Sequence, residues 1–213
     1  MTGEAGAGRQ VGRDHGPPTT PVNLPAMLAY VFWHWPTAGT ARPSYESAML
    51  DFHERLRDAG SPALLRSRTF RVDGEPWLPN GRGYVDWYLL EGGFAALEVL
   101  NELAVSPSLK EAHDRPAHMV AGGAGGVYRL IAGVSGGQPP VAATWLSKPG
   151  SVSYPAFHER LRRWTDRKDL TLWQRQMVLG PALEFCLQSP EPPDFPRDWR
   201  PLVARWTVVG GNG

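Results

Sequence analysis

Apolar side chains recur along the first half of the chain with two different periods. The aromatic and β-branched run LAYVFWHW (28–35) ends at a proline and predicts a strand. Helical spacing follows between Ser44, the expected N-cap, and Gly60. The apolar positions of that helix are Tyr45, Met49, Phe52 and Leu56. Two strands (63–72 and 84–91), helical segments from Phe94 onwards and a strand at 127–133 complete this half.

A similar order returns in the second half. We expect strands at 141–149, 170–178, 182–189 and 202–209, with a helix after the first of them. The apolar positions of that helix are Tyr154, Phe157, Leu161 and Trp164. The segment PEPPDFPRDWRP contains too many prolines for a second full helix.

Strand, helix, strand, strand, helix, strand is the order of a ferredoxin-like unit. The sequence therefore predicts an α+β protein of two tandem ferredoxin-like repeats, the second degenerate. We place the repeats at 25–134 and 141–213, with a linker at 135–140 and a disordered N-terminal lead at 1–24. The hexamer FHERLR occurs in both copies, at 52–57 and 157–162. We interpret it as a solvated helix face that marks duplication and not an active site.

Composition narrows the range of partners. The 213 residues include 22 basic and 21 acidic side chains, so a net charge of +1 gives no reason to expect a nucleic-acid partner. No apolar run is long enough for a membrane span. The single cysteine, Cys186, excludes an internal disulfide, and the N-terminus lacks the apolar core of a signal peptide. We expect a cytoplasmic monomer or homodimer.

The stretch SKPGSVSYPAF (147–157) lies between an expected strand and an expected helix. It resembles the same junction in EthD-like and antibiotic-biosynthesis-monooxygenase-type members of the dimeric α/β-barrel superfamily. The matching residues are Lys148, Pro149, Gly150, Ser153 and Phe157. The first copy keeps only Pro36, Ser44 and Phe52 of this pattern.

The resemblance implies that the two sheets close into one barrel with the helices outside and a ligand cavity inside, here within one chain. Members of that superfamily include cofactor-free monooxygenases, polyketide cyclases, haem enzymes and stress proteins. The fold therefore does not select one function.

Strand alternation groups the candidate site residues. In the strand at 84–91, Val85, Trp87 and Leu89 should pack under the helices, and the opposite face should then meet the barrel interior. That opposite face carries Tyr84, Asp86 and Tyr88 in the first copy, and Ala182, Glu184, Cys186 and Gln188 in the second. Both copies are thus predicted to aim a carboxylate inwards. Arg68 and Arg175 are the expected partners of these carboxylates, and structural ion pairs between the copies are the alternative to catalysis.

In the strand at 28–35 one face carries Tyr30, Phe32 and His34, and the other carries Val31, Trp33 and Trp35. Nothing in the sequence decides which face turns inwards, and we favour His34. Such a wall suits a planar aromatic or polyketide-like ligand.

Two further motifs are interpreted as structural. GVSGG (133–137) lacks the strand-to-helix context of a nucleophile elbow and is assigned to the linker. GGAGG (122–126) lacks the lysine of a phosphate loop and is expected to be a flexible turn.

His113 and His118 lie where haem-holding relatives often place a ligand. Two histidines five residues apart, with a proline between them, do not share a helix face, so no joint metal site is expected. A single axial haem ligand remains an alternative.

These observations favour a small-molecule enzyme of specialised metabolism that uses acid–base chemistry without a dissociable organic cofactor. A cyclase, an isomerase or a cofactor-free monooxygenase would fit. The alternatives are a haem enzyme and a non-catalytic binding or stress protein. The candidate catalytic residues are Asp86, Glu184 and His34. The candidate substrate contacts are Tyr30, Tyr84, Tyr88, Arg68, Arg175 and Cys186. No metal site is expected.

Overall fold

The structure is a computed structural model that describes residues 27–135, 137–177 and 180–211. The expected N-terminal lead, residues 1–24, lies outside the described residues. The proposed limits of the two repeats stay a prediction.

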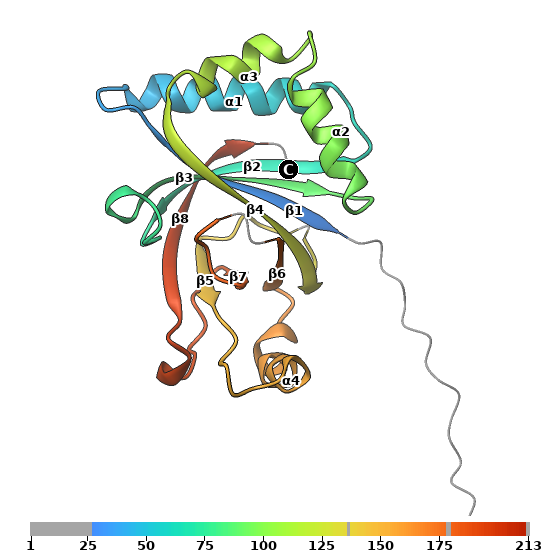
Figure 1. Cartoon of the computed structure of the whole chain (residues 1–213), viewed down its shortest axis with the longest axis vertical. Coiled ribbons are helices and arrows are strands. Elements are labelled where there is room, and N and C mark those ends of the chain that lie inside the picture. Colours follow the sequence, from blue (N-terminus) through green and yellow to red (C-terminus); the bar gives the residue numbers. More distant parts are fainter. Residues whose placement is uncertain (1–26, 136, 178–179, 212–213) are drawn as a thin grey trace, which may run out of the picture.

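The described chain forms one closed antiparallel barrel of eight strands with helices on its outside (Figure 1). The first half contains β1 (Leu28–Pro36), α1 (Arg42–Asp58), β2 (Leu64–Asp73), β3 (Arg82–Leu90), α2 (Ala95–Ala104), α3 (Lys110–Ala117) and β4 (Val120–Ala132). The second half contains β5 (Ala142–Leu146), α4 (Tyr154–Thr165), β6 (Thr171–Met177), β7 (Phe185–Ser189) and β8 (Leu202–Gly211). No full helix stands between β7 and β8. The predicted α+β fold of two ferredoxin-like halves, the second degenerate, is confirmed.

The two halves are joined through their outer strands. The barrel order is β1-β3-β2-β8-β5-β7-β6-β4, so β2 pairs with β8 and β4 pairs with β6 across the boundary between halves. Closure leaves no unpaired sheet edge among these strands, which removes a route to aggregation. Figure 1 shows α1, α2 and α3 covering the sheet at one end of the molecule and α4 at the opposite end.

The first helix begins earlier than the sequence suggested. Its N-cap is Ala41, which makes no side-chain capping bond, and Pro43 lies in the first turn. Ser44 as N-cap was wrong, because a proline is well suited to the first turn and moves the start upstream of the serine. Helix α4 does have a serine N-cap, since the Ser153 hydroxyl accepts a hydrogen bond from the Ala156 N–H at 3.4 Å.

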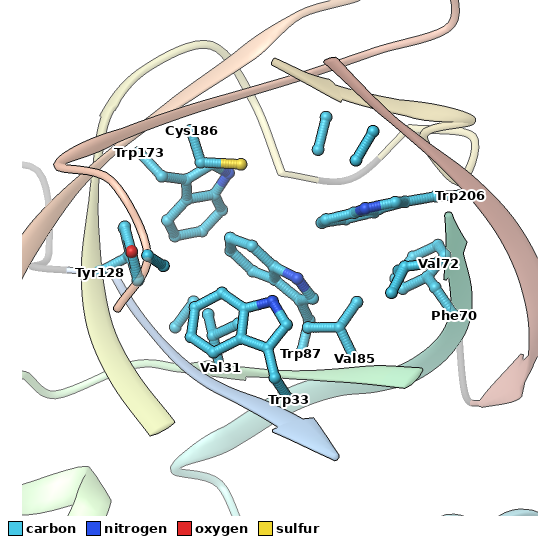
Figure 2. Packing of buried hydrophobic residues seen from close by; sticks show 14 of the residues in the cluster. Val31, Trp33, Phe70, Val72, Val85, Trp87, Tyr128, Trp173, Cys186 and Trp206 are labelled. Carbon is cyan, nitrogen blue, oxygen red and sulfur yellow. The ribbon is translucent and has the colours of Figure 1, made fainter. Parts of the chain in front are cut away.

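Indole rings fill the inside of the barrel (Figure 2). An eight-stranded barrel has an interior just wide enough to be packed by side chains. The rings that occupy it belong to Trp33, Trp87, Trp145, Trp173 and Trp206, and each is at most 3% exposed. The interior is therefore largely a packed core, and the space left beside Trp87 and Trp173 is a pocket at one end of the barrel.

This filling reverses the predicted faces of β3. Val85, Trp87 and Leu89 line the barrel interior, so the expectation that they pack under the helices was wrong. The opposite face, with Asp86 and Tyr88, points towards α1, α2 and α3. The physical reason is volume, because this face of β3 supplies Trp87 to fill the closed barrel.

The prediction for β7 holds in part. Cys186 faces the barrel, whereas Phe185 and Leu187 pack beneath α4. The second half therefore follows the predicted assignment at these positions.

One carboxyl group lies among the barrel tryptophans. Glu75, in the loop after β2, is fully buried and accepts hydrogen bonds from the indole N–H groups of Trp145 at 3.1 Å and Trp206 at 3.0 Å. Because both tryptophans belong to the second half, these bonds tie the halves together across the interior. Burial raises the pKa of Glu75 to about 7, against the opposing effect of the indole donors.

This raised pKa predicts a specific dependence of stability on pH. The folded state holds the Glu75 proton more tightly than the unfolded state, so stability present at low pH is lost as pH rises from about 4.5 to about 7. Glu75→Gln keeps an acceptor oxygen but does not ionise. We expect the variant to gain about 3 kcal/mol in unfolding free energy relative to the parent between pH 4 and pH 8. Urea unfolding of both proteins measures this difference, and a difference that stays constant with pH would contradict the assignment.

Candidate functional site

A cavity of about 460 Å³ lies between the outer face of the sheet and the helices α1, α2 and α3. Strands β1 and β3 supply its polar and aromatic wall, and the helices supply a largely apolar roof. The wall residues are Tyr30, Phe32, His34, Asp86 and Tyr88. The roof includes Met49, Phe52, His53, Leu97, Leu100 and His113. A concave apolar site with a few convergent polar groups is the usual form of a small-molecule site.

The register of two neighbouring strands brings the wall together. Phe32 on β1 lies opposite Asp86 on β3, and Tyr30 lies opposite Tyr88. The alternation correctly grouped these residues on shared faces. The predicted side of the sheet was wrong, because His34 and Asp86 face the helices and not the barrel interior.

Asp86 is the centre of a buried hydrogen-bond network. The Thr69 hydroxyl donates to Asp86 Oδ1 at 2.6 Å, and the Tyr88 hydroxyl donates to Oδ2 at 3.1 Å. The Nε2 atoms of His34 and His53 each lie 3.4 Å from one carboxylate oxygen. Burial alone would raise the pKa of Asp86, but the two imidazoles reverse this effect and hold the pKa well below its usual value.

The donors and acceptors of this network form a relay. The Tyr45 hydroxyl lies 2.6 Å from His34 Nδ1, while His34 Nε2 faces Asp86. An imidazole that carries its proton on Nε2 donates towards the carboxylate and accepts from Tyr45 at Nδ1. The order Tyr45, His34, Asp86 therefore links a phenol through an imidazole to an ionised carboxylate. The chemistry that this order supports is proton transfer.

The tyrosines around Asp86 stay protonated at neutral pH. Burial raises the pKa of Tyr30, Tyr45 and Tyr88, and the charge of Asp86 raises each further. Tyr84 points elsewhere, since its hydroxyl donates to Glu46 at 3.0 Å, and burial together with this bond raises its pKa to about 12. The phenols of the cavity are thus hydrogen-bond donors.

Stacked rings on β1 form the flat part of the wall. The rings of Tyr30 and Phe32 are stacked at 6.4 Å between centroids, and those of Phe32 and His34 at 5.4 Å. Glycines of β4 make room for these rings. A Cβ on Gly123 would lie 2.6 Å from Phe32 Cζ, and one on Gly125 would lie 3.1 Å from the Tyr30 hydroxyl oxygen. The segment 122–126 belongs to strand β4, so the expectation of a flexible turn was wrong. Glycine in a strand allows neighbouring groups to approach closely.

His53 is a member of the network that the sequence interpretation missed. It belongs to the repeated hexamer, yet it is 1% exposed, and its Nε2 atom lies 2.8 Å from the Thr69 hydroxyl. The solvated-face interpretation was wrong at this position. The available signal was spacing, since His53 lies eight residues after Tyr45 and four after Met49 on the buried stripe of α1.

The charged residues of the hexamer lie on the surface in both copies. Glu54 and Arg57 form an exposed pair at 3.4 Å, and Glu159 and Arg162 form its counterpart at 3.2 Å.

The second predicted carboxylate does not join this site. Glu184 lies beside α4, where it accepts a hydrogen bond from the Tyr154 hydroxyl at 2.7 Å. The expectation that Asp86 and Glu184 share one interior was wrong, because the two side chains lie beneath different helices. The expected arginine partners were also wrong. Arg175 donates to the carbonyl oxygen of Ala182, and Arg68 lines a separate pocket.

One histidine of the cavity, His113, has surroundings typical of a metal ligand. His113 on α3 lines the cavity, packs edge-on against Phe52, and has Nδ1 at 3.2 Å from the Asp114 carboxylate. A carboxylate on one ring nitrogen is the usual support for a metal-ligating histidine, so His113 fits an axial ligand through Nε2. His118 is exposed beyond α3 and does not line the cavity. Within the described ranges no cluster of three or more metal-ligating side chains occurs.

Comparison with known proteins supports the architecture. No protein-family model matches the sequence, and no functionally curated protein is detectably similar. A proposed monooxygenase from Fusobacterium nucleatum subsp. nucleatum is similar in structure, with 11% identity and a TM-score of 0.56 over 87% of this chain and 94% of that one. A proposed monooxygenase from Lactobacillus acidophilus NCFM gives 6% identity and a TM-score of 0.54 over 87% and 95%.

A proposed chlorite dismutase gives 12% identity and a TM-score of 0.50 over 88% of this chain and 97% of that one. At these identities the likeness shows the fold alone. That fold is the dimeric α/β barrel, closed here within a single chain. None of the helices in the described part of the chain has the length and apolar content needed to cross a membrane.

The close approach of Phe32 to Gly123 on β4 leads to a testable prediction. In Gly123→Ala the new methyl group would meet Phe32 and would also lie 2.9 Å from the Trp33 carbonyl oxygen, which is backbone and yields little. We expect a loss of about 1–3 kcal/mol in unfolding free energy, typical of overpacking. Gly150→Ala is the matched control, because nothing lies within 4 Å of its Cβ position, and should change stability by less than about 0.5 kcal/mol. Equal denaturant midpoints for the two variants would show that the rings do not pack on β4.

Proposed function

We propose that this protein is a small-molecule enzyme that performs acid–base chemistry on a planar aromatic or polyketide-like substrate in the cavity beneath α1, α2 and α3. A cyclase, an isomerase or a cofactor-independent monooxygenase of specialised metabolism fits this proposal. The observation that carries it is the relay from Tyr45 through His34 to an ionised Asp86, placed beside a wall of stacked rings. We place the enzyme in the cytoplasm, as a monomer or homodimer.

The first step is enolisation of the substrate. A proton leaves an acidic C–H or phenolic O–H of the substrate and reaches His34 Nδ1 through the Tyr45 hydroxyl, and the electron pair stays on the substrate as an enolate. Asp86 stabilises the imidazolium that forms. The Tyr30 hydroxyl makes no hydrogen bond within the described part of the chain, so it is free to donate to the enolate oxygen. His53, Thr69 and Tyr88 hold Asp86 in place.

The reaction types diverge after this step. Attack of the enolate on a second carbonyl of the substrate gives a cyclase, and return of the proton to another carbon gives an isomerase. With dioxygen as oxidant, the same enolate gives a monooxygenase: one oxygen atom replaces the two hydrogens of the substrate CH₂ group as a carbonyl, and the other leaves as water with those hydrogens. The acid–base groups of the wall are sufficient for enolisation, and Glu184, beside α4, has no part in it.

Haem binding is the second candidate. It is favoured by one specific observation, the His113 ring on the cavity wall with its Nδ1 atom beside Asp114. Haem would supply redox chemistry, and His113 would be the residue that holds it. The cavity lining contains no arginine or lysine to pair with the propionates among the described residues.

Hydrogen–deuterium exchange tests the acid–base proposal without knowledge of the product. Anthrone is a tricyclic ketone with an acidic C–H, and the exchange of this hydrogen for deuterium is followed by NMR. We expect Asp86→Asn to reduce enzyme-catalysed exchange by about 10²–10⁴-fold, the usual contribution of a positioned acid or base. Glu184→Gln is the matched control and should keep full exchange.

Loss of folding in Asp86→Asn would obscure that result, so Tyr45→Phe supplies a second test. It keeps the ring of Tyr45 and removes the hydroxyl that faces His34. We expect a large loss of exchange while quenching of tryptophan fluorescence shows that the ketone still binds with its affinity changed by less than about threefold. Full exchange in Tyr45→Phe would show that the proton does not pass through Tyr45, and loss of binding and exchange in equal measure would point to a binding protein.

An absorption titration with haemin separates the haem candidate. We expect no saturable Soret band that depends on His113. A sharp band that is lost in His113→Ala and kept in His118→Ala would replace the acid–base proposal with haem chemistry. His118 is the suitable control because it lies next to α3 but outside the cavity.

A further inference from the structure

A second cavity, of about 320 Å³, opens at one end of the barrel. Its lining comes from the first residues of β2 and β6, the last residues of β3 and β7, and the loops beside them. It shares no lining residue with the cavity beneath α1, α2 and α3. Strand β3 separates the two, because Trp87 faces the second cavity while Asp86 and Tyr88 face the first.

The rim of this barrel-mouth pocket is positively charged. Arg66, Arg68 and Lys168 line it, and no carboxylate of the described residues forms an ion pair with any of them. The only carboxylate in the lining, Asp169, is already held by two bonds from Arg167 at 3.1 and 2.7 Å. Partial burial lowers the pKa of Arg68, and the neighbouring charge of Arg66 lowers it further. An anion between the two guanidinium groups would offset this uncompensated charge.

The floor of the pocket is aromatic. Trp87 and Trp173 meet edge to face at 5.4 Å between ring centroids, and Phe70 lies beside them. The Trp173 indole is fixed by its bond to the Thr171 hydroxyl at 2.9 Å. A flat ring fits against such a surface, and the volume is about twice that of a cavity known to hold benzene, which suits a molecule of one or two rings.

We propose that the barrel-mouth pocket binds a small aromatic carboxylate. The carboxylate lies between Arg66 and Arg68 and the ring system packs on Trp87 and Trp173, with Lys168 at the rim. This site is separate from the acid–base site, and binding to it does not require that the proposed function is correct.

Calorimetry with 2-naphthoate tests this site in low-salt buffer at pH 7. We expect saturable binding that is at least tenfold weaker for the neutral isostere 2-naphthamide and at least tenfold weaker in Arg68→Met. Arg129→Met is the matched control, because it removes the same charge from an exposed position on β4, and it should bind 2-naphthoate like the parent.

The proposal is overturned if 2-naphthoate does not bind, if the amide binds equally well, or if Arg68→Met and Arg129→Met weaken binding to the same extent. The exchange activity of the first cavity is measured in the same samples, so failure of one proposal is distinguishable from failure of the other.

Discussion

The filling of a closed eight-stranded barrel is the constraint on which the rest of this structure depends. Such a barrel admits side chains but little else, and here it admits five tryptophans. In β1 and β3 the face that carries a tryptophan turns inwards. The polar residues of β1 and β3 are left on the outer face, where only the helices can shield them from water. The candidate site lies between sheet and helices for this reason.

The two buried carboxyl groups show how their surroundings set their charge. Asp86 has two hydroxyl donors and two facing imidazoles, and these hold its pKa below the usual value. Glu75 has two indole donors and no cation, and burial raises its pKa to about 7. A pair of titratable groups driven in opposite directions commonly separates a structural role from a chemical one. Glu75 joins the two halves of the barrel, whereas Asp86 orients the groups of the cavity.

The two halves have a similar order of elements but differ in the helices that cover their sheets. In the first half three helices cover the sheet, and the histidine of the repeated hexamer reaches the network around Asp86. In the second half α4 stands alone. There His158 packs against Phe185, and its buried Nε2 atom has no partner in the described part of the chain. Within the described residues, the duplicated motif therefore contributes its histidine to a buried carboxylate network in the first half only.

Hydrophobic period and turn residues are local properties, so the order of elements, the two-repeat architecture and the grouping of residues on shared strand faces could be predicted from the sequence. Tyr30, Phe32 and His34 were grouped in this way, and so were Asp86 and Tyr88. The face of each strand that turned inwards could not be predicted in this way, since that choice depends on the volume enclosed by all eight strands. Nor could it be predicted that His53 meets Asp86, that Glu184 does not, or that a glycine run is a strand beneath aromatic rings. These outcomes rest on contacts between segments far apart in sequence, which no local pattern encodes.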